Sequence, residues 1–196
     1  MTALHIAAME GRTGVAALLL QCGANADAKV KGDHSSVGNH KGRAEPWDTP
    51  FHVAARSGST GVVVVLLAGV NIDRTTRGHQ TALHLSARGG HEAIVRLLVA
   101  ADADVHIRSD TGLTAHGIAN IEARNSRFRS LRDGDGDNNG SQSAEKARYE
   151  RIAELTQATM NKYLYQFACF FGSAHYFDRY AKCIELEANS SSSFGL

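Results

Sequence analysis

Four copies of one short phrase recur along the chain at nearly regular intervals. Three copies are clear and read TALHIAA at 2–8, TPFHVAA at 49–55 and TALHLSA at 81–87. A weaker fourth copy, TAHGIA, begins at Thr114, and the four starts are 47, 32 and 33 residues apart. A fixed period near 33 residues predicts a stack of similar units. Such a stack forms a long binding surface more often than a reactive pocket.

Each period continues with the same three features after the phrase. A glycine turn comes first, then an apolar run, then a segment rich in asparagine and aspartate. The turns contain Gly11, Gly58 and Gly89-Gly90, the runs cover 15–20, 62–67 and 94–99, and the segments cover 23–27, 69–73 and 102–106. The combined pattern resembles the ankyrin repeat over residues 1–131.

This resemblance implies an all-α solenoid of helix-turn-helix units joined by finger loops. The repeats are expected at 1–28, 46–77 and 78–110, with a degenerate fourth at 111–131 and an insertion at 29–45. After them we expect a linker at 132–142, a helical tail at 143–188 and a disordered end at 189–196.

The threonine that opens each phrase is expected to cap a helix, because its hydroxyl satisfies a backbone N–H that lacks a helical partner. These threonines are Thr2, Thr49, Thr81 and Thr114. The phrase histidines are His5, His52 and His84, and one copy per repeat argues against a catalytic role. The resemblance implies instead that they tie adjacent repeats together by hydrogen bonds.

The apolar runs predict second helices with a buried stripe, since their residues recur at helical spacing. The stripe comprises Val15, Leu18 and Leu19 in the first repeat and Ile94, Leu97 and Leu98 in the third. Gly23 and Gly69 are expected to end their helices in a left-handed conformation, and Asp102 takes that place in the third repeat.

The insertion at 29–45 is polar and rich in glycine, so it predicts a loop of 14 extra residues. It is either a tolerated insertion or a partner-binding extension, because recognition residues often lie on loops. Trp47 follows it, where the family commonly has a turn glycine, and either anchors a contact or packs under the loop. His34 and His40 lack enough neighbouring ligands to predict a metal site.

The two ends of the array depart from the pattern. The chain starts inside a repeat without a polar capping unit, which suggests a fragment, a truncated gene model or a frayed first helix pair. The fourth repeat predicts a polar second helix that suits a C-terminal cap and carries Asn125, Ser126, Arg127, Arg129 and Arg132. Its arginines form either a solvated face or a contact for an acidic partner or nucleic acid.

The tail combines an acidic segment with a later cluster of aromatic residues. A calcium loop starting at Asp135 would place Lys146 where a glutamate ligand is required, so a linker is the better interpretation. Beyond it we expect one helix to about Phe171 and a second from about His175 to Glu187. This pair either closes the array or leaves an apolar face open for a partner helix.

Composition narrows the function classes. A net charge of +1 gives no bulk attraction to nucleic acid or membranes, and no stretch approaches the ~18 apolar residues that a membrane span needs. The start lacks the pattern of a signal peptide. The odd number of cysteines, Cys22, Cys169 and Cys183, predicts reduced thiols in the cytoplasm or nucleus.

These observations predict a monomeric protein-interaction module or adaptor that has no cofactor and is not an enzyme. It would bind a protein partner through its fingers and its concave helix face. The candidate contacts are Trp47, Arg74, Arg77, His79 and Arg108 on fingers, and Arg56 and Arg88 as a basic stripe on the inner helices. The alternative is a fragment or regulatory region of a larger ankyrin-containing enzyme or channel.

Overall fold

The computed structural model describes the backbone of residues 1–30, 47–132 and 139–171, and the side chains of 1–30, 47–126 and 143–162. Within these ranges it contains eight helices and no strand. They are α1 (Ala3–Met9), α2 (Thr13–Gln21), α3 (Pro50–Ser57), α4 (Thr60–Leu67), α5 (Ala82–Gly89), α6 (Glu92–Ala100), α7 (Ala115–Arg132) and α8 (Asn139–Phe171). The predicted all-α repeat fold is confirmed.

Local signals start and stop the first helix of each repeat. Thr2, Thr49 and Thr81 are the N-cap residues of α1, α3 and α5, and each has extended backbone geometry. Gly58 and Gly90 end α3 and α5 with φ of 77° and 71°. These left-handed angles reverse the chain into the second helix and are inexpensive only for glycine.

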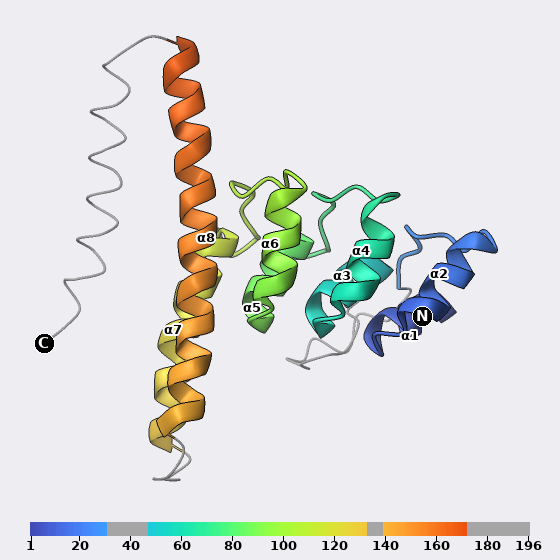
Figure 1. Ribbon diagram of the computed structural model, residues 1–196, viewed down its shortest axis with the longest axis horizontal. Coiled ribbons are helices and arrows are strands. Elements are labelled where there is room, and N and C mark those ends of the chain that lie inside the picture. The colour runs from blue at the N-terminus through green and yellow to red at the C-terminus, as the bar shows by residue number, and fades with distance from the viewer. Residues whose placement is uncertain (31–46, 133–138, 172–196) are drawn as a thin grey trace, which may run out of the picture. The chain divides into compact units, whose positions relative to one another are not determined.

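The helix pairs α1/α2, α3/α4 and α5/α6 follow one another as successive units of a stack (Figure 1). Each unit buries the large apolar residue of its phrase, which is Leu4, Phe51 or Leu83, with at most 2% of its surface exposed. Fully buried alanines in the same helices let neighbouring units approach closely. The core is therefore a continuous layer that runs through the stack.

The prediction of a buried stripe on α2 is wrong, because Ala16 is the one buried residue of this helix and Leu19 is only partly buried. Val15 and Leu18 are 48% and 60% exposed, whereas the equivalent of Val15 in the next two repeats, Val62 and Ile94, is completely buried. Each of those residues faces the preceding helix pair. No described residue covers the corresponding face of α2, so an apolar sequence alone does not bury it.

The helix end after α4 differs from those after α2 and α6. Gly23 and Asp102 have left-handed φ of 83° and 59°, as expected. Gly69 does not adopt a positive φ, so its predicted role is wrong. The reason is length: α4 has 8 residues whereas α2 and α6 have 9, and the shorter repeat omits the left-handed residue.

The fourth repeat contains one long helix, α7, where two short helices were expected within 111–131. Ala123 stands where the other repeats have the turn glycines Gly11, Gly58 and Gly90. Alanine favours the helix and disfavours the left-handed turn, so the helix continues to Arg132. α8 then begins at Asn139, four residues before the expected tail helix, because asparagine and serine suit a helix start as well as a loop.

α8 supplies the missing second helix of the fourth repeat. Ile152 and Thr156, which are fully buried, take the positions of Ile94 and Leu98 in α6. The ring of Tyr149 takes the position of His91 and lies against Gly90, as His91 lies against Gly58. The structure thus places the first half of the tail helix against the last repeat, and the second helix of the expected pair lies outside the described residues.

Residues Met1–Gln157 form one compact unit, and Ala158–Leu196 form a second, in which α8 continues as a helix to Phe171. Several expectations fall outside the described residues. These are the interior of the insertion with His34 and His40, the Asp135 loop, the side chains of Arg127, Arg129 and Arg132, the second tail helix and the disordered end.

Candidate protein-interaction surface

A row of three buried histidines holds the finger loops against the first helices. In each phrase the threonine N–H donates to Nδ1 of the histidine three residues later, at 3.1 Å for Thr2, 3.3 Å for Thr49 and 3.2 Å for Thr81. The opposite ring nitrogen, Nε2, donates to a finger carbonyl, which belongs to Asp48, Arg74 or Leu113. Because Nδ1 accepts an N–H, the proton of the neutral ring lies on Nε2.

This arrangement favours the uncharged imidazole. Burial lowers the pKa of His52 to about 4, although the bond to the Arg74 carbonyl opposes the shift. Burial also lowers the pKa of His5 and His84. A ring that must stay neutral and that uses both nitrogens in structural bonds is a poor general acid or base. These histidines therefore position the fingers.

The three fingers share one turn, closed by two backbone hydrogen bonds. In the second finger, Thr76 N–H donates to Gln80 O at 2.9 Å and His79 N–H donates to Thr76 O at 3.1 Å. Val30 and Trp47 form the same pair of bonds in the first finger, at 2.9 Å to Asp48 O and 3.1 Å to Val30 O. Lys29 and Val30 are thus part of the regular finger, and the inserted residues lie within 31–46.

The last residue of each turn has a left-handed backbone, and this places two large side chains at the tips. Trp47 and His79 have φ of 74° and 51°, where the third finger has Gly112 with φ of 76°. A left-handed backbone conformation costs a bulky residue on the order of 1–3 kcal/mol. Trp47 is also 48% exposed, and Lys29 Nζ lies 4.6 Å from the centre of its ring. It is half-exposed rather than packed in the core.

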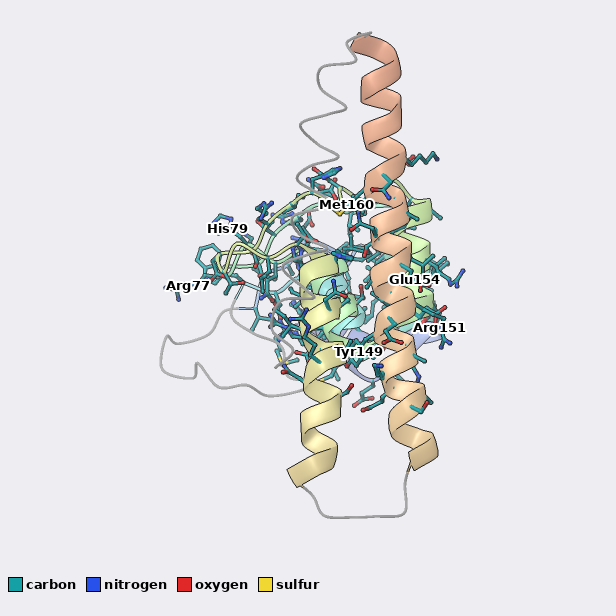
Figure 2. The ribbon with its side chains drawn as sticks, turned by 90° about the vertical axis from the view of Figure 1, so that its left-hand side faces the viewer. Arg77, His79, Tyr149, Arg151, Glu154 and Met160 are labelled. Carbon is teal, nitrogen blue, oxygen red and sulfur yellow. The ribbon has the colours of Figure 1, made fainter. Side chains whose placement is uncertain are left out.

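The arginines of the fingers differ in how far they are engaged. Arg74 Nη1 lies 2.7 Å from Asp27 Oδ1 and so joins the first two fingers. Arg108 Nη1 donates to Gly112 O at 2.9 Å within its own turn. Arg77 and His79 are exposed and lie on the finger loop, away from the helices (Figure 2). Of these four residues, Arg77, His79 and Arg108 are exposed and Arg74 is partly buried.

The predicted basic stripe of Arg56 and Arg88 consists of two unlike residues. Arg56 Nη2 lies 2.9 Å from Oδ2 of Asp48, and their side chains are 17% and 0% exposed. Its charge is therefore largely compensated within the protein. Arg88 is exposed at the equivalent position of the next repeat, where Gln80 replaces the aspartate. Of these two arginines, Arg88 is the exposed one.

Polar contacts fix the last repeat beside this surface. The Tyr149 hydroxyl donates to Arg88 O at 3.3 Å, just as His91 Nε2 donates to Arg56 O at 3.0 Å. Arg151 Nε lies 2.9 Å from Glu92 Oε2, and Figure 2 shows Tyr149 and Arg151 on α8. Hydrogen bonds from Arg96 and Arg151 lower the pKa of Glu92.

Sequence reasoning did not identify Lys29, Asp48 or Tyr149. Lys29 and Asp48 could have been assigned to the finger turn from the sequence, because the residues on either side of the insertion align with the turn residues of the uninterrupted fingers. Tyr149 could have been assigned to a second repeat helix, since YERIAELT at 149–156 matches HEAIVRLL at 91–98 at the second, fourth and seventh letters.

The described residues contain no group of three or more histidine, cysteine, aspartate or glutamate side chains placed to hold a metal ion. Among the same described residues, no helix is both long and apolar enough to cross a membrane.

Comparison with known proteins identifies the repeat. A model described as "Ankyrin repeat" matches residues 1–31, and one described as "Ankyrin repeats (3 copies)" matches residues 31–109. The chain is 35% identical over 121 residues to "Ankyrin repeat and KH domain-containing protein mask-1" of Caenorhabditis elegans, a match covering 60% of this chain and 4% of that protein.

Two further relatives are similar over shorter or comparable stretches. "Zygote-specific protein 3" of Chlamydomonas reinhardtii is 41% identical over 70 residues, covering 36% of this chain and 19% of that protein. "Neurogenic locus notch homolog protein 1" of Homo sapiens is 34% identical over 116 residues, covering 58% of this chain and 4% of that protein. The chain thus spans only a small part of the length of these relatives.

Proposed function

Because this chain belongs to the ankyrin repeat family, whose repeats generally serve in protein interaction, we propose that it is an adaptor that binds a protein partner and catalyses no reaction. The proposed contact surface comprises the finger tips and the exposed part of the inner helix layer. The observation that carries the proposal is the pair Trp47 and His79. Both present large side chains from left-handed backbone at the same position of adjacent fingers.

Trp47 is the proposed anchor of the interface. A tryptophan contributes more to binding than most residues when it becomes fully buried in a partner's pocket. Here its backbone conformation is unfavourable and about half of its surface is still exposed, so folding alone gains little from choosing tryptophan at this position. Lys29 orients the ring by a cation–π contact and leaves it accessible for binding.

Exposed hydrogen-bond donors set the proposed chemistry of the partner. Arg77, His79 and Arg88 offer exposed hydrogen-bond donors, and Arg56 and Arg74 form ion pairs with Asp48 and Asp27. We therefore assign Arg56 and Arg74 a rigidifying role and Arg108 a secondary one, since its guanidinium braces the third turn. The partner is expected to present an apolar residue to Trp47 and carboxylates to the arginines.

The cellular setting of the proposed adaptor is the cytoplasm or the nucleus, and its working form is a monomer. Cys22 is an exposed free thiol, and such thiols persist in reducing compartments. Fractionation of cells that express the tagged chain would test this, because recovery with the secreted proteins would refute it.

Affinity capture with a matched pair of variants tests the binding proposal. Trp47→Ala combined with His79→Ala removes the finger anchors, and Val64→Ala removes an exposed side chain from the outer helix α4, where Val64 is 52% exposed. A genuine partner is expected to lose at least about tenfold in affinity with the finger variant and to be unaffected by the control. Equal binding to both variants would place the interface elsewhere.

A photo-crosslinking residue placed at Arg77 provides an independent readout. Its side chain is exposed on the finger, so the crosslink is expected on the same partner. A crosslinker at Val64 is the matched control. If the partner crosslinks from Val64 and not from Arg77, the finger surface is not the interface.

A further inference from the structure

The outer side of α1 and α2 carries apolar residues that every later repeat buries. Ile6 is 46% exposed, whereas its equivalents Val53, Leu85 and Ile118 are 1%, 2% and 3% exposed. Val15 shows the same contrast with Val62 and Ile94, as described above. Together with Leu18, which is 60% exposed, Ile6 and Val15 form a surface that we name the end face.

The end face also keeps a glycine whose only evident use is close approach to a neighbour. In α4, a Cβ on Gly61 would collide with the Thr13 hydroxyl of the preceding helix pair. The equivalent residue of α2 is Gly14, and a Cβ there would meet nothing within 4 Å. Glycine inside a helix is unfavourable relative to alanine unless something needs the space. Gly14 thus resembles Gly61 in position, but no described residue occupies the space beside it.

A third position points to the same kind of neighbour. Ser59, His91 and Tyr149 each lie over the left-handed glycine of the repeat before them, which is Gly11, Gly58 and Gly90 in turn. Arg12 occupies this position in the first repeat and is exposed, with its side chain 67% accessible and Nε 3.3 Å from Glu10 Oε2. The end face therefore has the features with which the chain's own repeats contact one another: apolar residues that are buried in the later repeats, a glycine that allows close approach, and a residue placed to cover a left-handed glycine.

We propose that the end face docks one further ankyrin-type helix pair, which stacks on α1 and α2 as α1 and α2 stack on α3 and α4. We infer the occupant from the interfaces between the successive helix pairs of the chain, which the end face resembles. It would carry a hydroxyl or similarly small group opposite Gly14 and a left-handed glycine beneath Arg12. This proposal does not depend on the finger surface.

The first three helix pairs of a second copy do not meet this description. The forward faces of the first three units, which are the surfaces complementary to an end face, are already covered by the next unit of the same chain. The occupant is thus a helix pair other than these three.

The test joins a single consensus ankyrin repeat ahead of Met1 of the full chain and follows amide hydrogen exchange in α1 and α2. Burying Ile6 and Val15 more completely is expected to slow exchange there roughly 30-fold, which corresponds to about 2 kcal/mol at 1.4 kcal/mol per tenfold. Val15→Glu in the joined protein is expected to abolish the slowing. Val64→Glu, on an equally exposed valine outside the end face, is expected to preserve it.

Results of two kinds of experiment would overturn the proposal. Unchanged exchange in the joined protein, or a slowing that survives both Val15→Glu and Leu18→Glu, would show that the end face does not accept a repeat. Sedimentation of the unjoined chain supplies the other result. A dimer at micromolar concentration that Val15→Glu dissociates would show that a second copy is the occupant.

Discussion

Acidification should destabilise the repeat stack through its buried histidines, and His52 allows the size of the effect to be estimated. In the unfolded chain its pKa is near 6.5, whereas burial lowers it to about 4 in the folded protein. A lowered folded-state pKa means that the stabilisation is fully present above pH 6.5 and is lost as the pH falls through the range from 6.5 to 4. The full shift corresponds to about 3 kcal/mol at 1.36 kcal/mol per unit.

The structural cause is specific to the two ring nitrogens. Nδ1 accepts the Thr49 N–H and so has no room for a second proton, while Nε2 donates to Arg74 O. Replacing His52 by glutamine keeps a neutral side chain that can accept the same N–H, as in a capping box, but removes the titrating group.

Urea unfolding followed by circular dichroism at pH 7 and pH 5 measures this effect. The wild-type chain is expected to lose about 2 kcal/mol more than His52→Gln over this interval, as linkage predicts for a shift from 6.5 to about 4. His79→Gln removes an exposed imidazole from a finger tip and serves as the control. Identical pH dependence in wild type and His52→Gln would refute the reasoning, as would an NMR titration of His52 with a midpoint near 6.5.

Three further predictions use urea unfolding at neutral pH. Tyr149→Phe keeps the ring over the neighbouring glycine but deletes its hydrogen bond, so a loss of about 1 kcal/mol is expected; no loss would mean that the hydroxyl is not bonded. Gly61→Ala should destabilise by collision, whereas Gly14→Ala should stabilise by up to about 1 kcal/mol; equal signs would refute the contrast. Truncation after Gln157 should preserve the cooperative unfolding of the repeats, and truncation after residue 138 should weaken it by removing buried apolar surface.

The parts of the fold that the sequence predicts well are those fixed by short-range chemistry. Thr49 and His52 are three residues apart and bond to each other, so the start of the helix can be read directly from the phrase. Gly58 likewise marks a left-handed turn that few other residues adopt readily. Since both signals repeat at a fixed period, the helix pairs and their order could be predicted without coordinates.

The fourth repeat was harder to predict because its two halves are separated along the chain. His91 follows Thr81 by 10 residues, whereas Tyr149 follows Thr114 by 35. A search at constant period therefore expects the second helix within the polar end of α7 and misses the one in α8. Stacking depends on which surface a residue contacts and not on its distance along the chain, so a long connection is compatible with the same packing.

Exposure is the property that residue type and repeat position do not determine. Val15 and Val62 are the same amino acid at the same position of consecutive repeats, yet one is about half exposed and the other fully buried. Arg56 and Arg88 also share a position, but only Arg56 has an aspartate partner, supplied by the residue just before Thr49. In the first pair the neighbouring repeat decides whether the side chain is buried, and in the second pair a single residue at the start of the same repeat decides whether the arginine has an acidic partner. Binding residues in a repeat protein therefore have to be identified from differences between equivalent positions, since the shared pattern chiefly reports what holds the stack together.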